Sequence, residues 1–107
     1  MIRAVYDRKN NKITVEGHAY SGEPGHDLIC ASASMLIYTI AVAVENMKCA
    51  QHVSDAVIDL TGGECVVGCE PYEKFKAAIT LIFDSICAGY DLLSANYPDN
   101  VSYTIKE

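Results

Sequence analysis

The apolar and polar residues of this chain follow two periods, one of about two residues and one of about 3.6 residues. Alternation with the period of a strand is clearest in residues 12–19, where small or apolar residues alternate with Thr14, Glu16 and His18. Similar β-rich stretches recur along the chain, at residues 1–8, 53–60, 64–70 and 101–106. The pattern therefore predicts five strands.

Two longer stretches have the period of helices. The first is predicted to run from Asp27, whose carboxylate can cap a helix N-terminus, to about Lys48. It is apolar almost all round, so we expect it to be central and covered on more than one side. The second is predicted from Pro71 to about Ala95 and should pack through one face. Its apolar stripe consists of Phe75, Ile79, Ile82, Ile86, Tyr90 and Leu93.

The predicted elements follow one another in the order β-β-α-β-β-α-β. Turns at Asn10-Asn11 and at residues 61–63 join two pairs of strands into hairpins. At 107 residues the chain has the length of one domain, spanning residues 1–107. We therefore expect an α+β fold with two layers, in which a mostly antiparallel or mixed sheet carries both helices on one face.

Charge and composition make some partners improbable. The net charge is −6 and the eight Lys and Arg residues are scattered, which disfavours direct binding to nucleic acid. The long apolar run of residues 28–44 falls short of the roughly 20 residues that span a bilayer, so we interpret it as a buried helix without membrane contact. Five cysteines, an odd number, and an N-terminus without a signal-peptide pattern indicate reduced thiols and a cytoplasmic location.

Candidate chemistry gathers between Gly17 and Ser34. His18 lies at the end of a predicted strand and Cys30 near the third position of a predicted helix, with a glycine-containing loop between them. A helix N-terminus and an imidazolium both stabilise a thiolate, and N–H groups near the helix start, including that of Cys30 or Ala31, can receive an oxyanion. This arrangement is typical of a nucleophile with its base. Buried cysteines near helix starts are also common and usually inert, so spacing alone leaves a packing role open.

Two histidines compete for the role of base. His26 precedes Cys30 by four residues, but we prefer His18, because a base at a strand end is positioned independently of the helix. Strict alternation puts His18 on the polar face of its strand, opposite the face that the helices are expected to cover. A bulge at Gly17, or a site at the rim of the sheet, would resolve this conflict.

The residues around these positions resemble a known signature. The motif GHA at residues 17–19, the motif GHDLICA at residues 25–31 and the pair Ala33-Ser34 are similar to the signature of the bacterial ribosomal-processing cysteine protease family, Prp. The resemblance covers nearly the whole chain in length and element order. It includes the twelve-residue step from His18 to Cys30.

The resemblance implies a role for individual residues. Cys30 corresponds to the nucleophile of the family, and His18 to its general base and acid. The other characteristic motif positions are Gly17, Asp27 and Ser34. Asp27 either orients an imidazole or only caps the helix, and the sequence does not decide between these two roles. Residues 19–26 correspond to a loop that rearranges around the peptide, and this loop contains Tyr20, Gly22, Gly25 and His26.

The resemblance also implies an activity and partners. The family removes a short N-terminal extension from large-subunit ribosomal protein L twenty-seven and forms a homodimer. The reaction would be acyl transfer through a thioester on Cys30, which needs no metal and no cofactor. Two functions of other classes compete with this one. They are a non-catalytic, ribosome-associated module that binds a peptide, and a redox sensor with Cys30 as its reactive thiol.

The remaining cysteines are assigned no chemistry. Cys65 and Cys69 are four residues apart on a predicted strand, but two cysteines without a second ligand pair form a weak metal motif. Cys49 and His52 are three apart at a helix end, where packing and solvation are the simpler explanation. Cys87 is expected to pack within the second helix.

Overall fold

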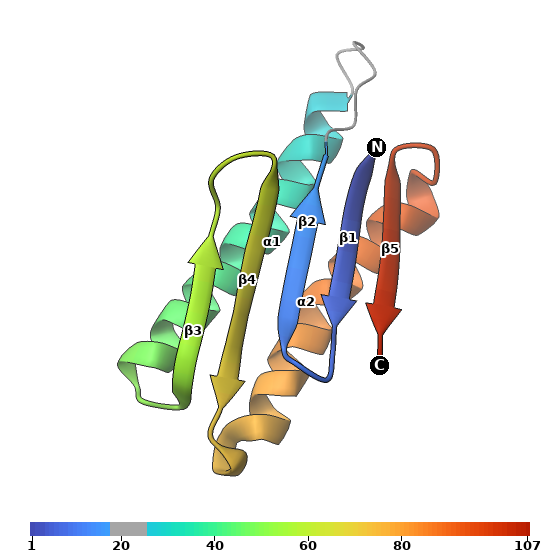
Figure 1. Ribbon diagram of the computed structural model, residues 1–107. Coiled ribbons are helices and arrows are strands. Elements are labelled where there is room, and N and C mark those ends of the chain that lie inside the picture. Colours follow the sequence, from blue (N-terminus) through green and yellow to red (C-terminus); the bar gives the residue numbers. More distant parts are fainter. Residues whose placement is uncertain (18–25) are drawn as a thin grey trace.

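Two helices cover one face of a five-stranded sheet in the computed structural model, which describes residues 1–17 and 26–107 apart from the side chains of His26 and Asp27 (Figure 1). The elements in chain order are β1 (Ile2–Asp7), β2 (Lys12–Glu16), α1 (His26–Cys49), β3 (Val53–Asp59), β4 (Glu64–Pro71), the 3₁₀ turn η1 (Glu73–Phe75), α2 (Lys76–Asn96) and β5 (Val101–Lys106). The element order and the α+β fold class predicted from the sequence are confirmed.

The sheet is mixed. Its strand order is β3-β4-β2-β1-β5, and neighbouring strands are antiparallel except β1 and β5, which are parallel. The hairpin of β1 and β2 turns at Asn11, whose φ is +49°. The end of β2, the N-terminus, the β3–β4 turn and the start of α1 all lie at one end of the molecule (Figure 1). The termini of several elements therefore meet where the sequence places its candidate chemistry.

The core lies between the sheet and the inner sides of the helices. Large side chains from both layers are fully buried there, and they are Tyr6, Ile13, Ile40, Val44, Val67, Phe83, Tyr90 and Val101. Full burial of one such side chain stabilises the fold by roughly 1.5–3 kcal/mol. The inward faces of α1 and α2 therefore hold the helices on the sheet.

The environment of α1 agrees with the prediction only in part. A helix that is apolar almost all round was expected to be covered on more than one side, but Leu28, Met35 and Val42 are 67%, 64% and 61% exposed. The inner side packs on β3 and β4, and a neighbouring side packs on α2. Contact on more than one side is therefore confirmed, but no element among the described residues 1–17 and 26–107 covers the outer side of α1.

The start and the buried stripe of α2 also need correction. Pro71 is the last residue of β4, and the chain enters α2 through a 3₁₀ turn that begins at Glu73. The prediction that α2 packs through one face is confirmed, and Ile79 and Tyr90 are buried. Ile82 is 39% exposed, because the buried stripe continues instead along positions spaced by three or four residues. These positions are Ile79, Phe83, Cys87 and Tyr90.

By length and composition, both helices are long and apolar enough to cross a membrane, over Leu28–Cys49 and Glu73–Asn96. The argument from the sequence that the first is too short is wrong, because α1 continues beyond residue 44 to Cys49. A helix that buries one side on a sheet is also rich in apolar residues. The inner sides of α1 and α2 are buried in this way.

A polar network ties β1 to α2. The Tyr6 hydroxyl donates to Asp84 Oδ1 at 2.8 Å, and Arg8 donates to both carboxylate oxygens, from Nε at 3.0 Å and from Nη2 at 3.1 Å. The hydrogen bonds from Arg8 hold the pKa of Asp84 below its usual value. Burial, with the bond to Asp84, raises the pKa of Tyr6. Folding therefore favours the ionised carboxylate.

Replacing Asp84 by Asn should lower the free energy of unfolding by about 1 kcal/mol near neutral pH, because a partly exposed bidentate pair contributes modestly. The folded pKa of Asp84 is depressed, so its contribution is present above the unfolded Asp pKa of about 3.9 and is lost as the pH falls through the folded pKa. Urea unfolding of wild type and Asp84→Asn from neutral to strongly acid pH should therefore show the difference shrinking toward zero.

Glu16→Gln is a matched control for this experiment. Glu16 faces Arg3 at 4.0 Å with both side chains well exposed, so loss of its charge should change the free energy of unfolding by less than about 0.5 kcal/mol. If the free energy of unfolding of Asp84→Asn stays below that of wild type by the same amount in strongly acid solution, the role of the Asp84 charge is contradicted.

Candidate active site

Cys30 lies in the second turn of α1. The helix begins at His26, so Cys30 is its fifth residue and Asp27 is its second, not the residue before it. The predicted N-cap position of Asp27 is therefore wrong, although a carboxylate in the first turn still favours the positive end of the helix. The first four N–H groups of a helix lack partners within it. The amides of Cys30 and Ala31 fall beyond these four, so the free donors precede Cys30.

A cavity of about 240 Å³ opens beside Cys30, between α1 and the end of the sheet. The Cys30 side chain is half-buried in its wall. The residues that line the cavity come from β1, β2, α1, β4 and the β3–β4 turn, and they are Ile2, Val15, Gly17, Cys30, Ala33, Ser34, Ile37, Tyr38, Leu60, Gly62, Gly63 and Cys65. Three residues singled out from the sequence, Gly17, Cys30 and Ser34, therefore meet at one cavity.

Gly17 occupies a crowded position that only glycine fits. Its φ is +90°, and a Cβ atom there would overlap with the carbonyl oxygen of Met1. Its amide donates to the Gly63 carbonyl oxygen at 3.3 Å, which joins the end of β2 to the β3–β4 turn. Because β2 ends at Glu16 and Gly17 has a left-handed conformation, strict alternation stops before residue 18. Alternation along β2 therefore does not determine on which face of the sheet His18 lies.

Several predicted residues lie outside the described part of the chain. His18, Tyr20, Gly22 and Gly25 belong to residues 18–25, and only the backbone of His26 and Asp27 is described. The choice between His18 and His26 as base stays a prediction, as does the role of Asp27.

The hydroxyls that follow Cys30 on α1 have different surroundings. Ser34, one helical turn beyond Cys30, lines the same cavity. Ser32 donates from Oγ to the Leu28 carbonyl oxygen at 2.8 Å, which is a bond within the helix. Of the two, only Ser34 borders the space that a substrate could enter.

Sequence reasoning missed Cys65 as a neighbour of the candidate nucleophile. Cys65 pairs with Val15 across β4 and β2, and this register brings its side chain to the cavity of Cys30. Burial, and secondarily the charge of Asp59, raise the pKa of the Cys65 thiol. Cys65 is therefore held as a neutral thiol near pH 7, which is a poor nucleophile. The pairing register of β2 and β4 was the signal that could have revealed this position of Cys65.

Tyr90 supports the Cys30 segment from α2. Its hydroxyl donates to the Ala33 carbonyl oxygen at 2.8 Å in the buried interior, and its ring stacks on Tyr103. The sequence indicated only an apolar role for Tyr90. The bond holds the turn of α1 that contains Cys30 against the second helix.

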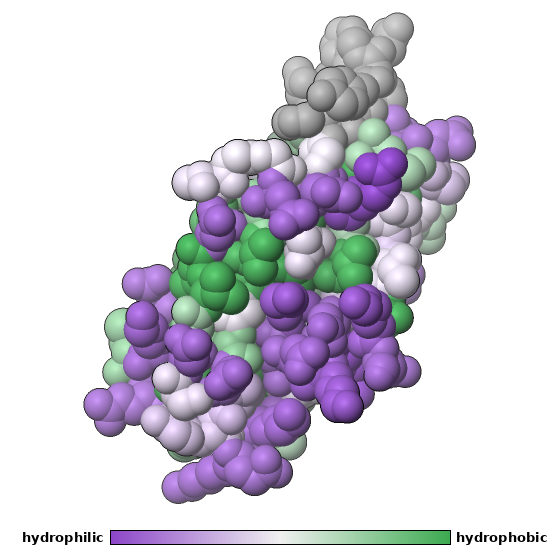
Figure 2. Space-filling model, viewed as in Figure 1, coloured by the Kyte–Doolittle hydropathy of each residue, from purple (hydrophilic) through white to green (hydrophobic). Residues whose placement is uncertain are grey.

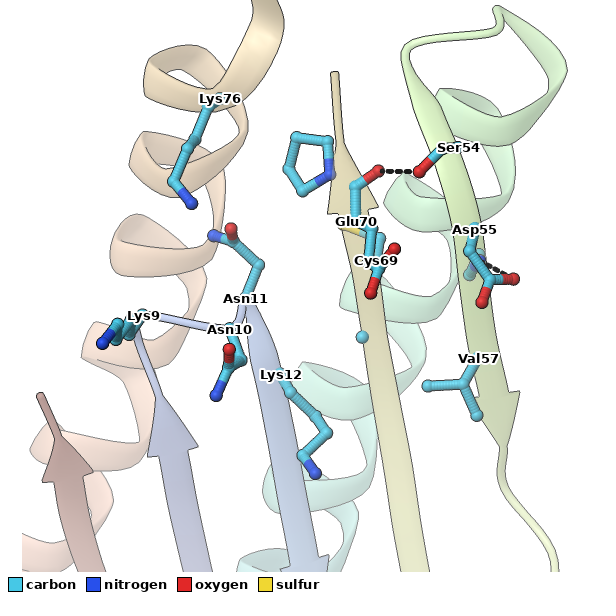
Figure 3. A pocket seen from close by; sticks show the side chains of 13 residues that line it. Lys9, Asn10, Asn11, Lys12, Ser54, Asp55, Val57, Cys69, Glu70 and Lys76 are labelled. Atoms are coloured by element: carbon cyan, nitrogen blue, oxygen red, sulfur yellow. Dashed lines mark hydrogen bonds between the residues drawn. The ribbon is translucent and has the colours of Figure 1, made fainter. Parts of the chain in front are cut away.

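A second cavity, of about 540 Å³, lies at the other end of the sheet (Figure 3). Its rim mixes charges of both signs, from Lys9, Lys12, Lys76, Asp55 and Glu70. The only thiol that lines it, Cys69, is buried, and burial raises its pKa to about 11. This cavity therefore offers no activated nucleophile.

The two pairs weighed as metal ligands, Cys65 with Cys69 and Cys49 with His52, gain no further ligand in the described ranges. Residues 1–17 and 26–107 hold no group of three or more His, Cys, Asp or Glu side chains placed for a metal ion. His52 instead stacks on Phe75, with ring centroids 4.1 Å apart. Cys87 is fully buried, and burial raises its pKa to about 12. Packing accounts for these side chains.

Comparison with known families shows to which family this chain belongs. The sequence model of the cysteine protease Prp family matches residues 1–102. The chain belongs to the Prp family. The resemblance drawn from the motifs is thereby confirmed, and the chain is a cysteine protease. Of the three functions that the sequence left open, family membership supports the Prp protease and not the binding module or the redox sensor.

Solved structures show the same Prp fold. SMU.848 from Streptococcus mutans is 25% identical with a TM-score of 0.67, over 98% of this chain and 93% of that one. The essential ribosomal processing protease Prp from S. aureus has been solved with a covalently linked product peptide and with a substrate peptide. These structures are 21% and 20% identical, with TM-scores of 0.67 and 0.66, over 98% of this chain and 97% of theirs. No curated protein sequence matches.

Gly17→Ala should lower the free energy of unfolding by more than about 2 kcal/mol, because it adds left-handed strain of about 1–2 kcal/mol to an overlap with the Met1 carbonyl. Gly62→Ala is the matched control. Gly62 also has a positive φ, of +75°, but a Cβ there meets nothing within 4 Å, so only the strain remains. Equal losses for the two variants in urea unfolding would contradict the close approach at Gly17.

Proposed function

We propose that this protease removes a short N-terminal extension from large-subunit ribosomal protein L twenty-seven, with Cys30 as nucleophile and His18 as general base and acid. The observation that carries the proposal is the half-buried Cys30 thiol, in the second turn of α1 and at the wall of a cavity. Further support comes from the family, whose S. aureus member is a ribosomal processing protease solved with peptides bound.

The proposed reaction proceeds in two steps. The Cys30 thiolate attacks the peptide carbonyl carbon, and the imidazolium of His18 gives its proton to the amine that leaves, so that a thioester forms. The imidazole of His18 then takes a proton from water, which attacks the thioester and releases the acid and the thiolate. The free amides that precede Cys30 are the proposed oxyanion donors.

The supporting residues take roles around this pair. Gly17 fixes the point at which the chain leaves β2 toward His18, through its bond to Gly63. Ser34 borders the cavity one turn beyond Cys30. We keep the loop of residues 19–26, with Tyr20, as the part that rearranges around the peptide. Asp27 orients the imidazole or only stabilises the helix start.

The setting of the protein follows from the same proposal. Its substrate is a ribosomal protein, and its five free cysteines suit a reducing compartment, so we place it in the cytoplasm. No cofactor takes part in the two steps. We further propose a homodimer, as the family resemblance implies.

Mass spectrometry of the extended ribosomal protein after incubation with enzyme tests substrate, reaction and nucleophile together. Wild type should shorten the substrate by its N-terminal extension, and Cys30→Ala should leave it intact, because the proposed thioester forms on Cys30. Cys65→Ala is the matched control, since it removes a thiol from the same cavity and should retain cleavage. Cleavage by Cys30→Ala, or its loss in Cys65→Ala alone, would show that the wrong cysteine was chosen.

The two histidines are separated by single substitutions. His18→Ala should lower kcat/KM by about 10²–10⁴-fold, the usual contribution of a general acid and base. His26→Ala should retain most of the activity. If His26→Ala is the inactive variant and His18→Ala is active, the base has been misassigned.

A further inference from the structure

The outer side of the β3–β4 hairpin is acidic. Residues 53–71 contain four carboxylates and no Lys, Arg or His. The strand register places all four on the open face of the sheet, where their side chains are exposed. Figure 2 shows a short apolar band across this face, bordered by hydrophilic residues on both sides. We call the outward side chains of the hairpin the hairpin face, and they are Asp55, Val57, Asp59, Glu64, Val66 and Glu70.

The other three strands carry their outward charges in a different way. Arg3 on β1 is directly opposite Glu16 on β2, and their side chains are 4.0 Å apart. Asp7 on β1 lies between Lys12 on β2 and Lys106 on β5. Opposite charges in directly opposed positions stabilise a sheet. These strands therefore balance their own charges.

On the hairpin face, like charges oppose one another. Asp55 on β3 is directly opposite Glu70 on β4. Glu64, near the other end of β4, is directly opposite Glu16. Like charges in such positions destabilise a sheet. The fold therefore keeps a repulsion on this face that a bound cation would relieve.

Lysines lie near one end of the hairpin face without neutralising it. Lys9, Lys12 and Lys76 line the cavity at the end of the sheet remote from Cys30, together with Glu70. In Figure 3, Lys76 points from α2 toward Asn11. Among residues 1–17 and 26–107, none of the four carboxylates forms an ion pair. Their charges are therefore available to a partner.

The hairpin face adjoins the cavity of Cys30. Asp59 ends β3 and Glu64 begins β4, and residues of the turn between them line this cavity. Asp59 accepts hydrogen bonds from the hydroxyl and the amide of Thr61, which hold its pKa below the usual value. The hairpin that bounds the candidate active site thus also carries the carboxylates.

We propose that the hairpin face binds the basic body of the ribosomal protein while its N-terminal extension occupies the cavity of Cys30. A protein that binds ribosomal RNA presents Lys and Arg to its phosphates. The aliphatic stems of such side chains cover apolar surface, here Val57 and Val66, while their charged ends reach carboxylates. This inference rests on the proposed substrate and adds a second surface to its recognition.

Other occupants fit the hairpin face less well. In a two-fold contact between copies of this chain, both copies would present the same patch, so that carboxylates would face carboxylates. Nucleic acid and anionic membranes are both negatively charged and would be repelled. A basic protein is the partner whose charge is complementary.

Kinetics with two substrates test this surface. One is the extended ribosomal protein, and the other is a short peptide across its scissile bond with any Lys or Arg replaced by Gln. The double variant Glu64→Gln/Glu70→Gln should raise KM for the protein by roughly 5-fold with kcat unchanged, because two exposed charge contacts are lost. With the short peptide, both constants should stay at their wild-type values.

Glu73→Gln/Glu107→Gln is the matched control. It removes the same amount of charge from two exposed residues outside the hairpin face and should leave KM for the protein unchanged.

The double variant Glu64→Gln/Glu70→Gln has two further readouts. It removes one charge from each like-charged pair, so its free energy of unfolding in urea should equal or exceed that of wild type. Raising the salt concentration from about 50 to about 500 mM should lower the wild-type kcat/KM for the protein, because salt screens exposed charges. The double variant should lose less of its kcat/KM over the same range.

An unchanged KM for the protein in the double variant overturns the proposal, as does an equal rise with the short peptide or with the control variant. Affinity of the inactive Cys30→Ala for the protein separates this inference from the proposed function. If Glu64→Gln/Glu70→Gln weakens that affinity but wild type does not cleave, only the proposed reaction is contradicted. Cleavage together with an affinity that the two substitutions leave unchanged contradicts only the hairpin face. Absence of both binding and cleavage overturns both.

Discussion

The arrangement at the candidate active site depends on the close approach of three backbone segments at Gly17. The end of β2, the carbonyl of Met1 and the β3–β4 turn meet there, with the Gly17 amide bound to the Gly63 carbonyl. No side chain fits between them. This junction fixes where the chain leaves the sheet toward residue 18, and it builds one wall of the cavity whose other wall carries Cys30.

Two thiols share that cavity, and they lie in different environments. Cys65 sits on a strand, where burial and the charge of Asp59 disfavour its ionised form. Cys30 sits in the second turn of α1, in the wall of the same cavity. The Tyr90 hydroxyl, on the second helix, donates to the carbonyl oxygen of Ala33, three residues after Cys30. The proposed nucleophile and the buried thiol of Cys65 thus lie on different elements that border the same space.

The sequence predicts most of the fold because its elements carry local signals. Strand alternation, turn residues and helical periods gave the element order, since each signal is read within a few residues. The exposure of α1 and the position of Cys65 could not be predicted in this way. The exposure of α1 depends on how many layers of the fold cover the helix. The position of Cys65 depends on the register between β2 and β4, two strands that lie far apart in the sequence. Motif resemblance supplied the chemistry, because spacing alone does not distinguish a nucleophile from a packing thiol.

The crowding of Met1 against Gly17 also bears on how the protein is best handled in the laboratory. The N-terminus and the end of β2 lie together at the end of the molecule that holds the Cys30 cavity, and Ile2 lines that cavity. The C-terminus lies toward the opposite end of the sheet (Figure 1). An affinity tag fused before Met1 would emerge beside the cavity and compete with a peptide for the space. A tag placed after Glu107 would leave that space clear.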